Sequence, residues 1–159
     1  MELVFEVYLL SDKFIKDYPL SDYPELMYKQ GRPYNCLLID SHDGYFICIP
    51  FRSNINHPNA YMFKRTKRSK FTKSGLYYSK VLIISETAYF DSKKAVVDDD
   101  EYTETVQNID KIASEILIYV DKYIAHISGE KVLNNREFER KYKFSTLKYF
   151  HRELGIKEL

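Results

Sequence analysis

The order of apolar and polar residues predicts strands in the first part of the chain and helices in the last part. Residues 3–10 are rich in β-branched and aromatic side chains, as is typical of a strand. Two further apolar runs are separated by a segment that ends in Asp43-Gly44, a pair that favours a hairpin turn. Strands are therefore predicted at residues 3–10, 34–39, 45–49, 61–64, 77–85 and, as a short element, 88–90.

Helical spacing replaces this pattern after residue 98. Apolar residues recur every three or four positions from Val106 to Ile127, which predicts a helix of more than five turns. The acidic residues 98–101 suit its N-terminal end, and Gly129 suits its C-terminal end. Short helices are predicted at residues 13 to about 18, 136–141 and 145–154. Because the strands precede most helices, we expect an α+β fold with an antiparallel, strongly curved sheet.

Length and composition limit the classes of protein. With 159 residues, 45% of them hydrophobic and 30% charged, residues 1–159 fit one globular domain. No apolar run is long enough to span a bilayer and the N-terminus does not resemble a signal peptide, so we expect a cytoplasmic protein. Cys36 and Cys48 are predicted to be buried thiols. The four histidines have no metal-ligand spacing to them, and no glycine-rich nucleotide motif is present, so we expect neither metal nor cofactor.

The charges are distributed unevenly along the chain. The net charge is +1, and Asp and Glu make up 23 of 159 residues, about one in seven. About six acidic residues would be expected between Gly44 and Ser85, yet this segment has none. It does contain eight basic residues: Arg52, Lys64, Arg65, Lys67, Arg68, Lys70, Lys73 and Lys80. A local positive field of this kind attracts a polyanion.

Aromatic residues occur among these basic residues and favour RNA or single-stranded nucleic acid over duplex DNA. Rings next to cations can stack on unpaired bases. The alternative is a solvated basic loop beside an ordinary sheet. The aromatic residues of the segment are Tyr45, Phe46, Phe51, Tyr61, Phe63, Phe71, Tyr77 and Tyr78.

A polar segment, residues 50–59, follows the predicted strand that ends at Ile49. It contains Arg52, Ser53, His57 and three asparagines, together with two prolines, Pro50 and Pro58. RNA cleavage by the neighbouring 2′-hydroxyl needs a proton acceptor, a proton donor and groups that stabilise charge on the phosphate. Arg52 could bind the phosphate, Ser53 could donate a hydrogen bond and His57 could transfer a proton. A polar loop with a solvated histidine is the alternative interpretation.

These residues resemble the endoribonuclease toxins of type III toxin–antitoxin systems, the ToxN, AbiQ and CptN-like group. The resemblance covers most of the chain. In the better-known branch a strand ends in Pro-x-Thr-Ser-x-x-Lys, and here residues 50–57 read Pro-Phe-Arg-Ser-Asn-Ile-Asn-His. Ser53 matches the family serine, Arg52 stands at the threonine position, and the lysine is missing. The groups that carry the positive charge and the proton are therefore left open between Arg52 and His57.

Two other segments fit the same group. Tyr28 and Arg32 match a tyrosine that lies four residues before a basic residue ahead of the hairpin. The segment 75–84 matches a Gly-Leu turn that leads into a strand carrying a lysine, here Lys80. Each residue also has an ordinary interpretation, because Tyr28 could pack, Arg32 could pair with a carboxylate and Lys80 could protect a strand edge.

The resemblance implies a fold, an activity and a partner. The fold would be a compact, strongly curved barrel like that of the MazF and Kid toxins, with helices packed around it. The activity would be metal-independent RNA cleavage that leaves a 2′,3′-cyclic phosphate and a 5′-hydroxyl. The partner would be a small pseudoknot RNA that inhibits the toxin, with several copies of protein and RNA in a closed assembly, and some members of the group protect bacteria against phage.

Fourteen residues follow as candidates for the site. The catalytic candidates are Tyr28, Arg32, Arg52, Ser53, His57 and Lys80, and the RNA-binding candidates are Lys64, Arg65, Lys67, Arg68, Lys70, Lys73, Tyr77 and Tyr78. Two other functions are compatible with the same charge pattern. One is a non-catalytic RNA-binding module, and the other is a structural domain whose basic loop meets an acidic partner.

Overall fold

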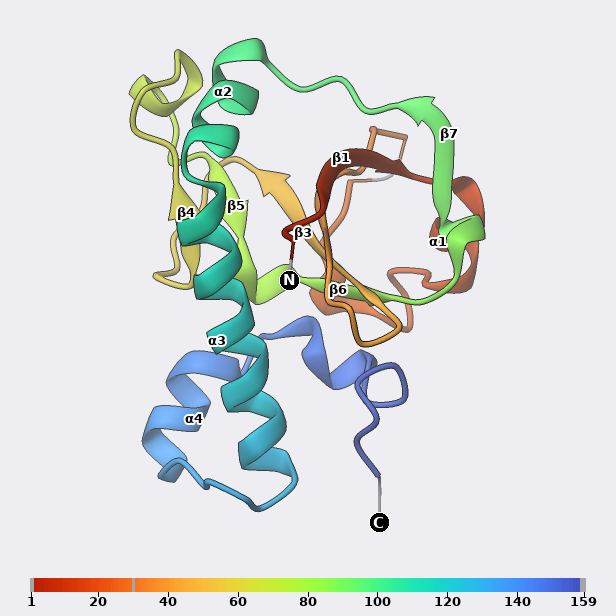
Figure 1. Cartoon of the computed structure of the whole chain (residues 1–159), viewed down its shortest axis with the longest axis vertical. Coiled ribbons are helices and arrows are strands. Elements are labelled where there is room, and N and C mark those ends of the chain that lie inside the picture. The colour runs from red at the N-terminus through yellow and green to blue at the C-terminus, as the bar shows by residue number, and fades with distance from the viewer. Residues whose placement is uncertain (1, 30, 158–159) are drawn as a thin grey trace.

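The computed structural model describes residues 2–29 and 31–157 and has an α+β fold (Figure 1). Its seven-stranded antiparallel sheet has the order β4-β5-β3-β2-β1-β7, and β6 also pairs with β3. The long helix α3 runs along one side of the sheet, and the C-terminal helical segments lie beyond one end of it. The strands are β1 Phe5–Leu10, β2 Asn35–Asp40, β3 Phe46–Arg52, β4 Ala60–Met62, β5 Gly75–Tyr77, β6 Leu82–Ile84 and β7 Phe90–Lys94.

The β2–β3 hairpin forms the centre of the sheet, as the sequence predicts. Its register runs from Cys36 opposite Pro50 to Asp40 opposite Phe46. Gly44 has a φ of 90°, which a residue without a side chain adopts without strain, so Asp43-Gly44 closes the turn. The expected strand at residues 3–10 is also confirmed as β1, which pairs with β2 and, on its other edge, with β7. Cys36 and Cys48 are buried free thiols, as expected.

The prediction of a strongly curved, MazF-like barrel is wrong, because the sheet is neither closed nor strongly curled. The reason lies at β3, one edge of which is shared by two short strands. Phe46–Cys48 pair with β6, whereas Phe51 and Arg52 pair with β5. The sheet therefore branches at this edge instead of continuing around a closed cylinder, and β4 and β7 end its two sides.

The predicted strand at residues 77–85 is interrupted in the structure. It consists of the end of β5, a 3-10 turn at Tyr78–Lys80 and then β6. Tyr78, Ser79 and Lys80 are 4%, 2% and 3% exposed, so three consecutive side chains are buried instead of alternating between the two faces of a sheet. The short strand expected at 88–90 is likewise a 3-10 turn, Thr87–Tyr89, and β7 begins only at its end.

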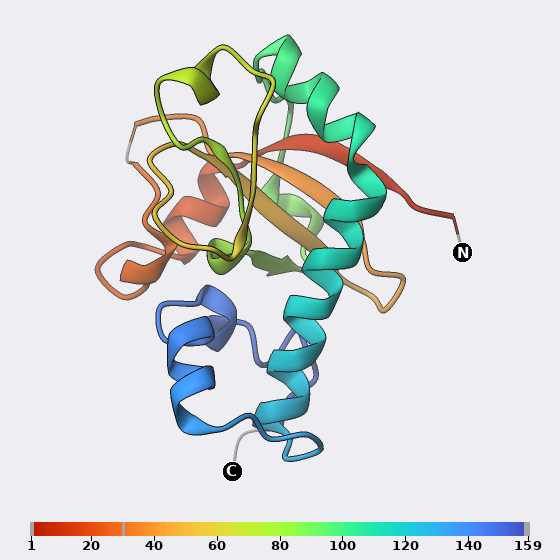
Figure 2. The ribbon, with the colours of Figure 1, turned by 90° about the vertical axis from the view of Figure 1, so that its left-hand side faces the viewer.

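The predicted long helix from Val106 to Ile127 corresponds mainly to α3 (Ile109–Ile127). Its first two residues belong to a separate helix, α2 (Asp99–Gln107), which ends before Asn108. Ile112, Ile116 and Val120 of α3 belong to the same buried core as the central strands. Both helices hold the segments that follow β3. Figure 2 shows α2 beside the loop that joins β4 to β5, and α3 passing across these strands.

The remaining helices support the ends of the sheet. Ser11 caps α1 (Asp12–Asp17), which confirms the predicted helix at this point. The predicted C-terminal helices correspond to α4 (Asn135–Tyr142) and to a shorter 3-10 turn at Thr146–Tyr149 capped by Ser145. Other 3-10 turns lie at Pro24–Leu26 and Arg68–Lys70. Over the ranges that the structure describes, no helix is both long and apolar enough to cross a membrane.

Candidate functional site

A cavity of about 260 Å³ lies where four segments of the chain meet. The segments are residues 28–35, the end of β3, the turn at Arg68 and residues 96–101, which lead into α2. Four of the six catalytic candidates lie there together with one of the RNA-binding candidates. The lining residues are Tyr28, Lys29, Arg32, Pro33, Tyr34, Asn35, Phe51, Arg52, Ser53, Arg68, Val96, Val97, Asp98 and Glu101.

Ser53 is presented by the end of a buried strand. It follows Arg52, the last residue of β3, and is exposed. Asn54 has a φ of 58°, a left-handed conformation that asparagine tolerates better than most residues, and it turns the chain at this point. The next residue, Ile55, is 2% exposed, and its amide donates to the carbonyl of Lys73 at 2.8 Å. The serine is therefore fixed between the sheet and the end of the basic loop, residues 64–73.

Arg52 holds the opposite wall of the cavity in place. Its guanidinium donates hydrogen bonds to the carbonyl oxygens of Leu26, at 2.8 Å, and Met27. It also lies over the ring of Tyr34, 5.2 Å from the ring centroid. Met27 has a φ of 51°, a strained conformation for a side chain of this type, and Arg52 holds its carbonyl. Arg52 is thus a positioning residue at this site.

Tyr28 and Arg32 lie on the same wall of the cavity and differ in their exposure to solvent. Tyr28 is 5% exposed, its hydroxyl donates to the carbonyl of Tyr18 at 3.0 Å, and burial raises its pKa. Arg32 is exposed, and among the described residues no carboxylate lies within ion-pair distance of its guanidinium. Tyr28 therefore shapes the cavity, whereas Arg32 offers it a free positive charge.

Lys80 does not line the cavity and instead supports the turn behind it. Its ammonium donates to the carbonyl of Phe144 at 2.8 Å and lies 3.8 Å from Oε2 of Glu25. Burial lowers the pKa of Lys80, and the carboxylate of Glu25 opposes that shift. Glu25 belongs to the turn Pro24–Leu26, which ends at the carbonyls held by Arg52.

The remaining candidates near this region also lie outside the cavity lining. His57 accepts a hydrogen bond at Nδ1 from the amide of Asn59 at 3.2 Å, and its ring centroid is 6.5 Å from that of Tyr77. Tyr77 is half-buried. Tyr78, which was expected to bind RNA, is buried and donates its hydroxyl to Glu115 at 2.9 Å, so its ring packs in the interior.

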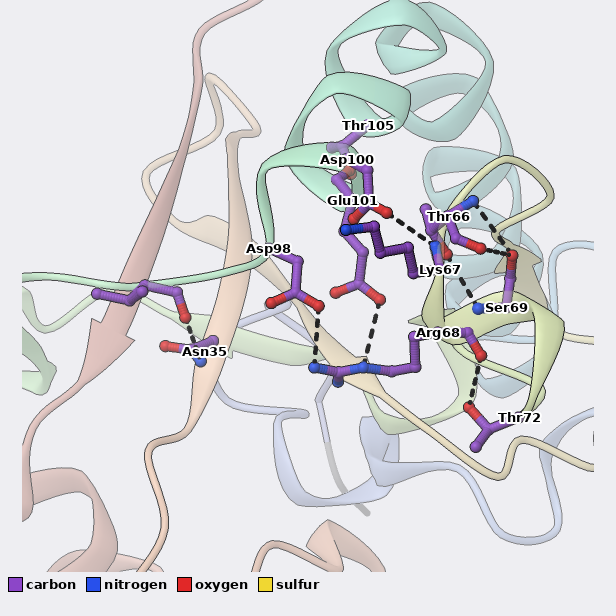
Figure 3. Close-up of polar contacts among 11 residues, drawn as sticks. Asn35, Thr66, Lys67, Arg68, Ser69, Thr72, Asp98, Asp100, Glu101 and Thr105 are labelled. Carbon is purple, nitrogen blue, oxygen red and sulfur yellow. Dashed lines mark hydrogen bonds and ion pairs between the residues drawn. The ribbon is translucent and has the colours of Figure 1, made fainter.

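The basic loop is braced by the acidic side of α2 (Figure 3). Asp100 accepts a hydrogen bond from the amide of Lys67 at 2.8 Å. Glu104, which is 4% exposed, accepts from the amides of Lys64 at 3.0 Å and Arg65 at 2.8 Å. These two carboxylates therefore bind backbone amides of the loop.

Arg68 is the residue that connects the basic loop with the cavity. Figure 3 shows its guanidinium reaching toward two carboxylates, those of Asp98 at 3.3 Å and Glu101 at 3.8 Å. The side chain of Glu101 is only 4% exposed. Burial raises the pKa of Glu101, and the charge of Arg68 opposes the shift. The cavity thus contains cations and a buried carboxyl group beside the exposed Ser53.

Sequence reasoning missed Asp98 and Glu101 as site residues. An acidic cluster at the start of a helix already has a local explanation in the helix dipole. The sequence did offer one signal, the complementary charge of two segments. Residues 98–101 are the first acidic cluster after a basic segment that has no acidic residue. Acidic residues of this cluster contact the basic loop within the same chain.

The other basic residues of the loop are exposed. Within residues 2–29 and 31–157, no ion pair links their side chains to a carboxylate. Lys64 and Arg65 line a second cavity of about 360 Å³ with Lys111 and Glu104. The positive field predicted from the sequence is therefore reduced mainly at Arg68. The residues concerned are Lys64, Arg65, Lys67, Lys70 and Lys73.

No cluster of three or more His, Cys, Asp or Glu side chains in the described part of the chain is arranged to hold a metal ion. Comparisons of the chain with protein-family models, with curated proteins and with solved structures found no match. The relationship to the toxin group accordingly stays a prediction from the motifs.

The role of Lys80 as a support leads to a prediction about stability. Replacing Lys80 by Met leaves the carboxylate of Glu25 without its cation, so the free energy of unfolding should fall by about 3 kcal/mol in urea denaturation. The double variant Lys80→Met with Glu25→Gln should recover part of that loss, since the unpaired charge is gone. An unchanged urea midpoint for Lys80→Met would contradict this assignment.

Proposed function

We propose that the protein is an endoribonuclease that cleaves RNA at the cavity around Ser53. One observation carries the proposal. Ser53, Arg32 and Arg68 come from three distant segments and line one cavity that opens beside an exposed, cation-rich loop. An RNA strand attracted by the loop would meet a hydroxyl and two guanidinium groups at its phosphate.

The cleavage step uses the ribose of the substrate as the nucleophile. The 2′-oxygen attacks the adjacent phosphorus as its proton leaves, the bond from phosphorus to the 5′-oxygen breaks, and that oxygen takes up a proton from water. The products are a 2′,3′-cyclic phosphate and a 5′-hydroxyl. Ser53 donates a hydrogen bond to the phosphate, while Arg32 and Arg68 stabilise the charge that develops on it.

Glu101 is the group at this cavity best suited to accept the 2′-hydroxyl proton. It lies next to Arg68, which is proposed to bind the phosphate, and its raised pKa makes it a stronger base than an ordinary glutamate. His57 and Lys80 were the sequence-based candidates for this role. Neither lines the cavity, and the ammonium of Lys80 is bound to Phe144.

The resemblance to the type III toxins extends the proposal to a cellular role. The protein would be a toxin whose RNA cleavage stops growth and can protect bacteria against phage. A small pseudoknot RNA would inhibit it by covering the basic loop and the cavity in a protein–RNA assembly. The cavity is lined by the end of β3 and by neighbouring loops, so RNA cleavage there does not require a closed barrel.

The Ser53→Ala variant tests the proposed cleavage. We expect wild-type protein to cut 5′-labelled RNA in EDTA and to leave cyclic phosphate ends, since the resemblance implies a reaction without metal. Ser53→Ala should lower the rate about 100-fold or more and leave RNA binding intact, because one phosphate donor is lost. Ser21→Ala, another exposed serine, is the control.

The same assay separates cleavage from binding alone. If the wild-type protein retains labelled RNA in a gel shift but releases no fragments, it is a non-catalytic RNA-binding module. If it cuts RNA and Ser53→Ala cuts equally fast, the cavity is not the site of cleavage.

The dependence of cleavage on pH tests Glu101. The carboxylate must be ionised to accept a proton, so the wild-type rate should fall as pH drops through its raised pKa. Glu101→Gln should lower the rate about 100-fold or more and abolish this acidic limb. Asp99→Asn, at an exposed acid in the same helical turn, should keep the limb. A Glu101→Gln enzyme with the wild-type limb would exclude Glu101 as the base.

A further inference from the structure

Phe71 is the one aromatic residue of the basic loop, and it is exposed to solvent. Its side chain is 86% exposed, although it is a large apolar ring. Neighbouring aromatics from the same acid-free segment are buried, with Tyr61 at 6%, Phe63 at 5% and Tyr78 at 4% exposure. These three pack into the core, so Phe71 has no comparable role inside the protein.

The backbone around Phe71 is held in a fixed shape. Phe71 ends the 3-10 turn that begins at Arg68, and its amide donates to the carbonyl of Arg68 at 3.0 Å. The hydroxyl of Ser69 donates to the carbonyl of Thr66 at 2.7 Å, and the amide of Lys67 is bound by Asp100. An apolar ring on an ordered turn loses little conformational entropy when a ligand binds it.

The charges around this ring indicate a polyanionic ligand. Lys70 precedes Phe71, and Lys73 follows two residues later. Both side chains are exposed, and neither forms an ion pair with a carboxylate in the portion of the chain that the structure describes. A protein partner with a plain apolar groove would use the ring but would leave these charges unmatched. An unpaired nucleotide satisfies both, since its base stacks on the ring and its phosphates meet the lysines.

We propose that the basic loop is a docking platform for single-stranded RNA, on which Phe71 stacks against a base next to the cleavage cavity. The inference rests on the proposed function in that it takes RNA as the ligand. A 3-10 turn rises about 2 Å per residue, so Phe71 lies only about 6 Å along the turn from Arg68. Arg68 lines the cavity, so the stacked base belongs to a nucleotide close to the one that is cut. Stacking does not depend on base identity, and the platform therefore contributes affinity instead of sequence preference.

Binding to a strand that cannot be cleaved tests the platform. The probe is a 12-nucleotide oligomer of 2′-O-methyluridine, in which the nucleophile is blocked, and affinity is measured by fluorescence anisotropy. Phe71→Ala should weaken binding about tenfold, and Phe71→Leu should weaken it by about the same factor. Phe71→Trp, which keeps an aromatic ring, should bind as tightly as the wild type. Val132→Ala, at an exposed apolar residue outside the loop, should bind as the wild type does.

The dependence of binding on salt separates the ring from the charges. Phe71→Ala should keep the wild-type slope of log affinity against log salt, whereas Lys70→Ala should reduce the slope by about one. Duplex RNA of the same length should be insensitive to Phe71→Ala, because its bases are already stacked.

Three outcomes would overturn the inference. If Phe71→Ala binds the single strand as tightly as the wild type, or if Phe71→Leu retains full affinity, ring stacking is excluded. Wild-type cleavage of RNA would then still uphold the proposed function. If the wild-type protein binds no RNA, the platform and the proposed function fail together.

Discussion

The carboxylate of Glu104 is the contact on which the shape of the candidate site depends. It is buried between α2, β4 and the basic loop, and it accepts hydrogen bonds from the hydroxyl of Tyr61 at 2.8 Å and from the amides of Lys64 and Arg65. A buried carboxylate is stable only when such donors surround it. It binds backbone amides, and in the described part of the chain it forms no ion pair with a basic side chain, so it orders the loop and leaves the side chains of Lys64 and Arg65 unpaired.

One turn before Glu104, acidic residues at the start of α2 contact a basic side chain of the loop instead of its backbone. Asp98 and Glu101 lie near the guanidinium of Arg68, so the positive field is reduced where the loop meets the cavity and is retained on the exposed lysines. Incoming phosphate would compete with these carboxylates for Arg68, and the release of Glu101 from that ion pair would free it to accept a proton. Binding and chemistry are thus linked through one arginine in the proposed function.

Sequence patterns predicted the elements that depend on residues close together in the sequence. The β2–β3 hairpin and α3 follow from apolar periodicity and from Asp43-Gly44. The interrupted segment 77–85 does not, since Tyr78 and Lys80 turn inward to reach Glu115, Glu25 and Phe144, which are distant in sequence. At the site, motif order grouped Tyr28, Arg32, Arg52 and Ser53, and the structure places all four around one cavity. It could not show that the guanidinium of Arg52 is hydrogen-bonded to two backbone carbonyls. Nor could it show that Asp98 and Glu101, at the start of α2, complete the lining of the cavity.

A comparison of two matched variants tests the central claim, that α2 shapes the loop for RNA. Glu104→Gln and Asp99→Asn each raise the net charge from +1 to +2, so charge alone predicts slightly tighter RNA binding for both. Glu104→Gln should instead bind the blocked uridine strand more weakly than the wild type, and the amides of Lys64 and Arg65 should exchange hydrogen about 10-fold faster or more. Asp99→Asn should bind at least as tightly as the wild type with unchanged exchange. Equal affinities and equal exchange rates for the two variants would contradict the account.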